Sequence, residues 1–243
     1  MFKDSCCGRC QSGVPGLDAV LGGGFQRGGS VVVRGGIGTG KTVLAAQFLH
    51  NGAVQCGEPG VLMILEEGAA NYKKDMLRFG LDMGRLQDAG MLIMLDKPFC
   101  SSYLEKRTAT IRPDERNFFG MSDLVDLIIE SARKINAKRV VIDNLPAVSG
   151  LLKYGEYARQ VILYLNDRLQ REGLTSLIIS DDMHEKYDAV ADYLCDGVVC
   201  LVYRTGELDA GRRMYVKKMK GAKNSLDEHP LLLEEGTGMR VEP

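Results

Sequence analysis

Short apolar runs alternate with longer amphipathic segments over most of the chain. The apolar runs have the length and composition of buried strands, and they cover residues 30–34, 61–65, 91–95, 140–143 and 174–180. The segments between them carry apolar residues at helical spacing and predict helices over residues 42–56, 69–79, 123–135 and 156–171. This alternation is typical of an α/β fold with a parallel sheet.

The pattern changes after residue 196, where apolar runs follow one another without helical segments between them. These runs predict strands over residues 197–204, 212–218 and 230–233, separated by glycine-containing turns. We therefore expect a mainly parallel central sheet flanked by helices, with antiparallel strands added at an edge by the C-terminal part of the chain. Residues 96–120 are polar with little periodicity and are expected to form a long loop, the kind that is usually functional or mobile.

A glycine-rich motif lies between the first predicted strand and the first predicted long helix. Residues 35–42 fit G-x-x-x-x-G-K-[ST], the phosphate-binding loop, and the strand before it and the helix after it argue against a chance match. Backbone amides and the helix dipole would cradle a phosphate chain there, Lys41 would reach the β- and γ-phosphates, and the Thr42 hydroxyl would join Mg²⁺. The predicted ATP-binding residues are Gly35, Gly36, Ile37, Gly38, Thr39, Gly40, Lys41, Thr42 and Val43.

Acidic residues follow two of the predicted strands. Asp143 ends the strand at 140–143, where a carboxylate near Mg²⁺ belongs; a turn or helix cap is the alternative, and the phosphate loop favours the metal. Glu66 and Glu67 follow the strand at 61–65, and open α/β sheets bind ligands at the carboxyl ends of their strands. One of the two could orient or deprotonate the attacking water, whereas the simpler alternative is a solvated pair that begins a helix. We favour catalysis, with Glu66 ahead of Glu67.

Composition and charge limit the kinds of partner that the chain could bind and the cellular compartment in which it is expected. The chain has 243 residues and a net charge of −1, so it can form one large domain and has no general attraction to nucleic acid or anionic membranes. The N-terminus lacks the apolar segment of a secretory signal, and the apolar runs are too short to cross a bilayer. We expect a cytoplasmic protein with a short tail at residues 1–12 and a single domain at residues 13–243.

The chain has seven cysteines, and Cys6, Cys7 and Cys10 cluster near the N-terminus. A zinc site would need further ligands, but no second C-x-x-C and no paired histidines are present. These cysteines are interpreted as reduced thiols on a mobile terminus. The others are expected to be small buried hydrophobic residues, and they are Cys56, Cys100, Cys195 and Cys200.

The chain resembles the single-domain KaiC-type ATPases of the RecA superfamily from about residue 12 to residue 241. The motifs that carry the resemblance lie at residues 13–18, 21–24, 35–42, 65–67, 141–144 and 218–221. The resemblance implies a RecA-like core that binds ATP with Mg²⁺ at interfaces between subunits, typically in hexameric rings. It also implies that Lys41 and Thr42 hold phosphate and metal, that Asp143 is the Walker B acid, and that Glu66 activates water with Glu67 beside it.

The sequence departs from the family pattern in places that bear on function. The family carries a late K-x-R pair that reaches the γ-phosphate on a neighbouring subunit; here Lys218 matches, but Lys220 replaces the arginine and loses its bidentate fork. From the residues alone, an ordinary basic strand is the alternative. Residues 191–196 contain no Ser or Thr at the place of the clock protein's phosphorylation sites, and the clock protein's second domain is not present. Circadian autophosphorylation is therefore not expected.

These observations leave several functions open. The first is Mg²⁺-dependent ATP hydrolysis, expected to be slow, coupled to a conformational change or to assembly. The second is an ATP-binding switch that scarcely hydrolyses. The third is a DNA-dependent recombinase or helicase with DNA loops near residues 144–154 and 181–188, which the acidic second loop disfavours. Asp181 could sense the γ-phosphate or cap a helix, and residues 96–120 could face an unidentified protein partner.

Overall fold

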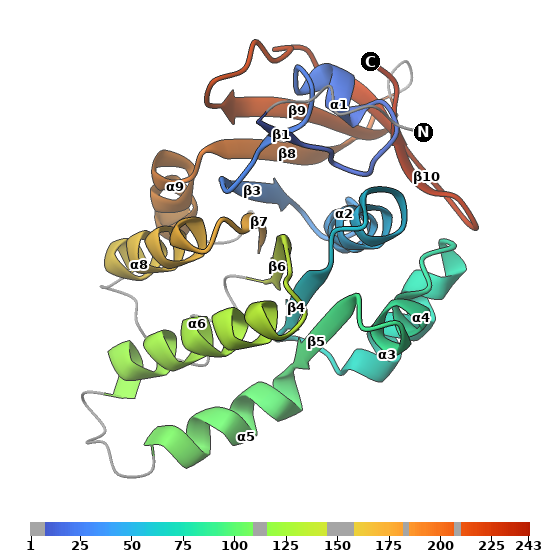
Figure 1. Ribbon diagram of the computed structural model, residues 1–243. Helices are drawn as coiled ribbons and strands as arrows, with labels where there is room; N and C mark the ends of the chain where they lie inside the picture. Colours follow the sequence, from blue (N-terminus) through green and yellow to red (C-terminus); the bar gives the residue numbers. More distant parts are fainter. Residues whose placement is uncertain (1–7, 109–115, 145–157, 182–184, 207–209) are drawn as a thin grey trace.

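The structure, a computed structural model, describes residues 8–108, 116–144, 158–181, 185–206 and 210–243. Within these residues one nine-stranded sheet runs in the order β11-β10-β9-β8-β3-β7-β6-β4-β5 (Figure 1). Its parallel strands are β3 (Ser30–Gly35), β4 (Gly60–Ile64), β5 (Leu92–Asp96), β6 (Arg139–Asp143), β7 (Thr175–Asp181) and β8 (Gly197–Arg204). Its antiparallel strands are β9 (Gly211–Met219), β10 (His229–Glu234) and β11 (Gly238–Val241).

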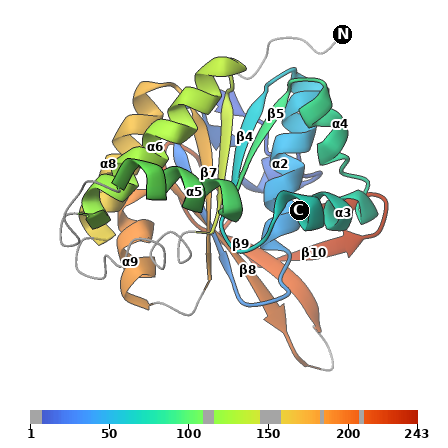
Figure 2. The same ribbon diagram turned by 90° about the horizontal axis from the view of Figure 1, so that it is seen from below.

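Helices cover both faces of this sheet (Figure 2). On one side lie α1 (Leu17–Val20), α2 (Lys41–Cys56), α3 (Ala69–Arg78) and α4 (Met83–Asp88). On the other side lie α5 (Lys97–Thr108), α6 (Arg116–Lys134), α8 (Ala158–Arg171) and α9 (Glu185–Leu194). Alternation along β3 shows how the faces divide, because Val31 and Val33 join the first core and Val32 joins the second.

The parallel register brings the carboxyl ends of the central strands to one edge. β3 pairs with β7 and β8, and β6 pairs with β4 and β7, so the last residues of β3, β4, β6 and β7 are near neighbours. The predicted α/β fold, mainly parallel with antiparallel strands from the C-terminal part, is confirmed. This edge is where open α/β sheets bind ligands.

The sequence pattern did not reveal β11. It has only four residues, and its place depends on a distant helix: the buried Gln47 of α2 accepts from the Met239 amide at 2.8 Å and donates to the Met239 carbonyl at 2.9 Å. The C-terminal hairpin is thereby attached to the helix that follows the glycine-rich loop. A contact between residues so far apart in the chain leaves no local signal.

The expectation of a long loop over residues 96–120 is wrong. Residues 97–108 form α5, α6 begins at Arg116 rather than at residue 123, and residues 109–115 lie outside the described part of the chain. In α5, Cys100 and Leu104 are buried against the second core at i,i+4 spacing, and the partly buried Tyr103 packs beside them on an otherwise mostly polar helix. A surface helix with so narrow an apolar face resembles a loop in sequence.

The prediction that the N-terminal cysteines lie on a mobile terminus is wrong for Cys10. Arg9–Cys10 forms β1, which pairs antiparallel with β2 (Phe25–Gln26), and Cys10 is buried rather than carried on a mobile terminus. Cys6 and Cys7 lie outside the described residues, and a single domain over residues 13–243 stays a prediction. Cys56 is exposed, contrary to expectation, whereas burial of the remaining cysteines is confirmed for Cys100, Cys195 and Cys200.

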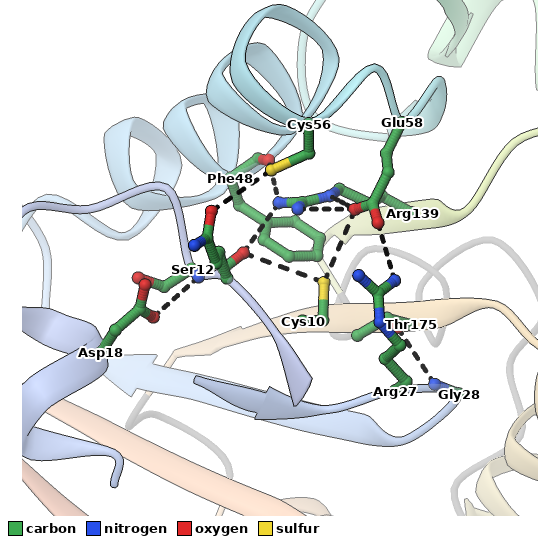
Figure 3. A network of polar contacts seen from close by, with 11 residues as sticks. Cys10, Ser12, Asp18, Arg27, Gly28, Phe48, Cys56, Glu58, Arg139 and Thr175 are labelled. Carbon is green, nitrogen blue, oxygen red and sulfur yellow. Dashed lines mark hydrogen bonds and ion pairs between the residues drawn. The ribbon is translucent and has the colours of Figure 1, made fainter. Parts of the chain in front are cut away.

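A buried polar network ties this N-terminal strand to the sheet at the edge opposite the carboxyl ends (Figure 3). The Arg139 side chain at the start of β6 is fully buried, and its guanidinium lies 4.6 Å from the centroid of the Phe48 ring. It pairs with Glu58 at 2.7 Å and donates to the carbonyls of Gln11 and Phe48. Arg27 also pairs with Glu58 at 2.7 Å, so one carboxylate serves two guanidinium groups.

Among the described residues, no helix has the length and apolarity needed to cross a membrane.

Candidate functional site

The glycine-rich loop lies between β3 and α2 at the carboxyl edge of the sheet. Gly40 precedes α2 with a φ of 104°, a left-handed conformation that favours glycine. A Cβ at Gly35 would collide with the carbonyl oxygen of Leu201 on β8, so this position also needs glycine. The Thr39 hydroxyl donates to the Gly36 carbonyl at 2.9 Å and closes the turn. The loop is thus shaped as the motif predicts, ahead of a helix N-terminus that attracts anions.

Lys41 begins α2 and turns its ammonium group back into the loop. Its Nζ donates to the carbonyls of Gly35 at 2.7 Å and Gly36 at 2.9 Å, and it pairs with Asp181 at 2.9 Å. The lysine is buried, and Asp181 is the last residue of β7, the strand beside β3. The ammonium group therefore already has an anionic partner, which the phosphates of a nucleotide would have to replace.

The predicted metal residues lie together. Asp143 ends β6 and is buried, and burial raises its pKa from 3.8 to about 6, with the charges of Glu66 and Glu67 adding to this and the Thr42 hydroxyl and Lys41 opposing it. A divalent cation would remove this cost of holding a negative charge. A hydroxyl and a carboxylate suit Mg²⁺, which keeps few protein ligands and completes its shell with water and phosphate oxygens. Thr42 and Asp143 therefore fit the ion that the sequence predicted.

The adjacent glutamates differ in their surroundings. Glu66 Oε1 accepts a hydrogen bond from Asn144 Nδ2 at 2.8 Å, so its side chain is oriented toward the end of β6. Glu67 is partly buried, and burial followed by the charges of Asp75 and Glu66 raises its pKa. Through Asn144, Glu66 is connected to the end of β6, and its role as the base ahead of Glu67 stays a prediction.

Asn144 lies in the candidate site, although no role was predicted for it from the sequence. Its Nδ2 reaches Asp181 Oδ2 at 3.3 Å as well as Glu66, so it connects the carboxylate paired with Lys41 to the candidate base. Arg212 on β9 was also missed, since it was interpreted as part of a basic strand; its Nε donates to the carbonyl of Gly38 in the loop at 3.0 Å. The position of Asn144 directly after Asp143 was the only sequence signal for either residue.

Lys218 in β9 and Lys220 just after it, which were predicted to act on a neighbouring subunit, contact the end of α9 and its connection to β8. Lys218 Nζ donates to the carbonyls of Asp192, Tyr193 and Cys195 at 2.9, 3.0 and 2.6 Å. Burial and then the charge of Lys220 lower the pKa of Lys218. Lys220 pairs with Asp196 at 2.9 Å. Lys218 thus holds the C-terminal end of α9 and Lys220 the connection that follows it, both within their own chain, and their action in trans stays a prediction.

The loops in which RecA-like proteins would hold DNA were placed at residues 144–154 and 181–188. Residues 145–157 and 182–184 lie outside the described part of the chain. At the edges of these loops, Asn144 and Asp181 point into the site described above.

Changing Asp181 to asparagine is expected to tighten ATP binding measured without Mg²⁺. In the free protein the Asp181 carboxylate forms an ion pair with the Lys41 ammonium group, and it would repel the phosphates of ATP once Lys41 binds them instead. Removing the charge of Asp181 should therefore lower the ATP Kd about threefold to tenfold. Equilibrium titration with ATP in EDTA measures this. Asp167→Asn, which removes an exposed carboxylate from α8, is the matched control. An unchanged or weaker affinity in Asp181→Asn would contradict this role of Asp181.

The fold and the phosphate-binding loop together define the class of protein to which the chain belongs. A phosphate-binding loop after the first strand of a mainly parallel sheet, with Asp143 and Glu66 at the same edge, is that of a RecA-like P-loop nucleotide-binding protein. Comparison with known proteins narrows the class to a family. A family model described as "ATPase: KaiC" matches residues 10–243, and on this evidence the chain belongs to the KaiC family of ATPases.

Individual relatives agree with this assignment. A UPF0273 protein of Pyrococcus furiosus is 31% identical over 229 residues, which cover 91% of this chain and 89% of that protein. The circadian clock protein KaiC2 of Synechocystis is 30% identical over 240 residues, which cover 97% of this chain but 40% of that protein. The crystal structure of a KaiC-like protein from Pyrococcus horikoshii superposes with a TM-score of 0.81 at 30% identity, covering 97% of this chain and 99% of that one.

Proposed function

We propose that the chain binds ATP with Mg²⁺ and hydrolyses it slowly, in a cycle coupled to conformational change or assembly. The observation that carries this proposal is the convergence of three strand ends: the loop with Lys41 after β3, Glu66 after β4, and Asp143 with Asn144 at the end of β6. The candidate phosphate-binding loop, the candidate metal ligand Asp143 and the candidate base Glu66 thus lie at the same edge of the sheet. Membership of the KaiC family of ATPases supports the same reaction.

The residues have distinct tasks in this proposal. The amides of residues 36–42 and the Lys41 ammonium group hold the phosphates, while Thr42 and Asp143 hold Mg²⁺. When bound, Mg²⁺ would neutralise charge on the phosphate oxygens. Glu66, held by the Asn144 amide, orients a water molecule for attack on the γ-phosphate and accepts its proton.

Phosphate release in the presence and absence of Mg²⁺ tests the proposal. Wild-type protein with ATP and Mg²⁺ should release phosphate at a low steady rate, and EDTA should stop the release. The Lys41→Ala variant supplies the background, because it loses the ammonium group that holds the phosphates. A wild-type rate equal to that of Lys41→Ala, in protein shown to be folded, would contradict hydrolysis.

A switch that binds ATP and scarcely hydrolyses it is the second candidate. It is favoured by the contacts of Lys218 and Lys220, which are both engaged with the α9–β8 connection of their own chain. Lysine in place of arginine at residue 220 also stabilises a transferring phosphate less well, because it cannot make a bidentate contact. ATP binding without measurable turnover would favour this candidate over the first.

The proposal includes assembly into a homo-oligomer, a hexamer by family resemblance, in the cytoplasm. Action of Lys218 on a neighbouring nucleotide requires such neighbours. Size-exclusion chromatography with light scattering, with and without Mg-ATP, is expected to show an oligomer in the presence of nucleotide. A protein that stays monomeric while it hydrolyses ATP would contradict a role for Lys218 in trans.

A further inference from the structure

The segment that carries the candidate base is short and is anchored at both of its ends. β4 ends at Ile64, and the next amide, that of Leu65, donates to the carbonyl of Asp143 at 2.9 Å. α3 begins at Ala69, whose amide donates to Asp96 Oδ2 at 3.2 Å. Only residues 66–68 lie between these anchors, so the position of Glu66 depends on both of them.

The second anchor compensates for a missing helix cap. The residue before α3 is Gly68, which has no side chain to accept a hydrogen bond from the first turn. Asp96 supplies that acceptor from 27 residues further along the chain. A carboxylate at this place also interacts favourably with the helix dipole.

Asp96 holds a second helix with its other oxygen. It is the last residue of β5, and its Oδ1 accepts from the amide of Phe99 in the first turn of α5 at 3.2 Å. Since β5 pairs with β4, Asp96 lies in register with Ile64, two residues before Glu66. One carboxylate therefore fixes the starts of α3 and α5 relative to the strand that leads to Glu66.

The far side of α3 is fixed independently. Tyr72 in α3 is fully buried, and its hydroxyl lies 3.5 Å from the carbonyl oxygen of Thr42 in α2. Gly68 is tied to α3 as well, because its carbonyl accepts from the amides of Asn71 and Tyr72 at 3.2 and 3.3 Å. The contact with Asp96 therefore fixes the first turn of α3 together with Gly68, and its loss would let this turn, and with it Glu66, shift relative to β5.

We propose that Asp96 is a positioning residue that sets Glu66 for ATP hydrolysis through the start of α3. The inference rests on the proposed function, because the position of Glu66 affects turnover only if Glu66 is the base. Asp96 itself touches neither nucleotide nor water in this proposal. It acts on kcat through the geometry of a three-residue segment.

The test compares Asp96→Ala with Asp82→Ala. Asp82 caps α4 by accepting from the Arg85 amide at 2.9 Å, so its loss removes a helix cap of the same chemistry away from Glu66. Asp96→Ala is expected to lower kcat about tenfold or more with ATP Kd unchanged, whereas Asp82→Ala keeps the wild-type kcat. Asp96→Asn, a milder change that retains one acceptor oxygen, should give a kcat between those of Asp96→Ala and wild type.

Hydrogen exchange gives a readout that does not depend on activity. Amides of residues 66–71 should exchange faster in Asp96→Ala than in wild type and should be unchanged in Asp82→Ala. Unchanged exchange in this segment overturns the inference even if the wild type proves inactive. Faster exchange with a kcat equal to that of an active wild type, or an equal loss of kcat in Asp82→Ala, overturns it as well. A wild type without turnover would instead contradict the proposed function.

Discussion

Replacing Glu66 with glutamine is expected to lower the rate of ATP hydrolysis by about 10²–10⁴-fold, the usual contribution of a general base. Glutamine keeps the size of the side chain and the oxygen that accepts from Asn144, so the segment should stay in place. It cannot accept the proton of the attacking water. Because Lys41 and the loop amides are untouched, the ATP Kd should stay within about twofold of the wild-type value. Phosphate release and equilibrium titration measure the two quantities separately.

Glu67→Gln is the matched control for this prediction. It removes the same charge from the neighbouring residue and leaves the hydrogen bond from Asn144 to Glu66 in place. We expect a much smaller loss of turnover than in Glu66→Gln. If Glu67→Gln loses the activity and Glu66→Gln keeps it, the assignment of the base is wrong.

Replacing Glu58 with alanine is expected to lower the free energy of unfolding by about 3–5 kcal/mol, the usual cost of removing one partner of a buried ion pair. The Arg139 guanidinium would stay fully buried, with Phe48 and two backbone carbonyls around it but without its counter-ion. Urea denaturation of both proteins measures the difference. The site at the other edge of the sheet should still bind ATP below the denaturation midpoint.

The effect of Glu58 should also depend on pH. Burial alone would raise its pKa, but the hydrogen bond from Arg27 and the charge of Arg139 hold the pKa below the ordinary value of 4.5. A carboxyl with a lowered pKa stabilises the folded state above its unfolded pKa, and this contribution is lost as the pH falls below 4.5. The difference between wild type and Glu58→Ala should therefore shrink in acid.

Glu172→Ala is the control for a surface pair. Glu172 accepts two hydrogen bonds from Arg133 at the surface, where Arg133 is exposed and Glu172 is only partly buried, and surface pairs contribute little to stability. Its loss should change the denaturation midpoint far less than the loss of Glu58. A Glu58→Ala protein as stable as Glu172→Ala would contradict the importance of the buried network.

The sequence predicted those parts of the site whose signal is local. The phosphate loop places Lys41 and Thr42 because a strand, a glycine turn and a helix follow one another in the chain. Asp143 and Glu66 were predicted as site residues because each lies at the end of an apolar run, and the parallel strands do bring these ends to one edge of the sheet. The order of strands and helices likewise predicted the mainly parallel sheet.

The remaining features depend on contacts between distant residues. Asp181 pairs with Lys41, and Asp96 accepts a hydrogen bond from the first amide of α3. In both cases the partner belongs to another element of the fold, and no spacing in the sequence predicts such a contact. The helix α5 was not predicted because its sequence is mostly polar and its apolar face consists of a few residues such as Cys100 and Leu104. Burial of Cys10 follows from the pairing of β1 with β2, which two-residue strands do not signal.

Titration of the folded wild-type protein with ATP and Mg²⁺, beside Lys41→Ala and Lys138→Ala, tests the central claim most directly. Lys138→Ala removes an exposed ammonium group outside the site and controls for the change in charge. We predict saturable binding by wild type and Lys138→Ala, and an affinity about tenfold to a hundredfold weaker for Lys41→Ala, as expected for the loss of charged hydrogen bonds. A folded wild type that takes up no ATP, or that binds it no better than Lys41→Ala does, would contradict the account.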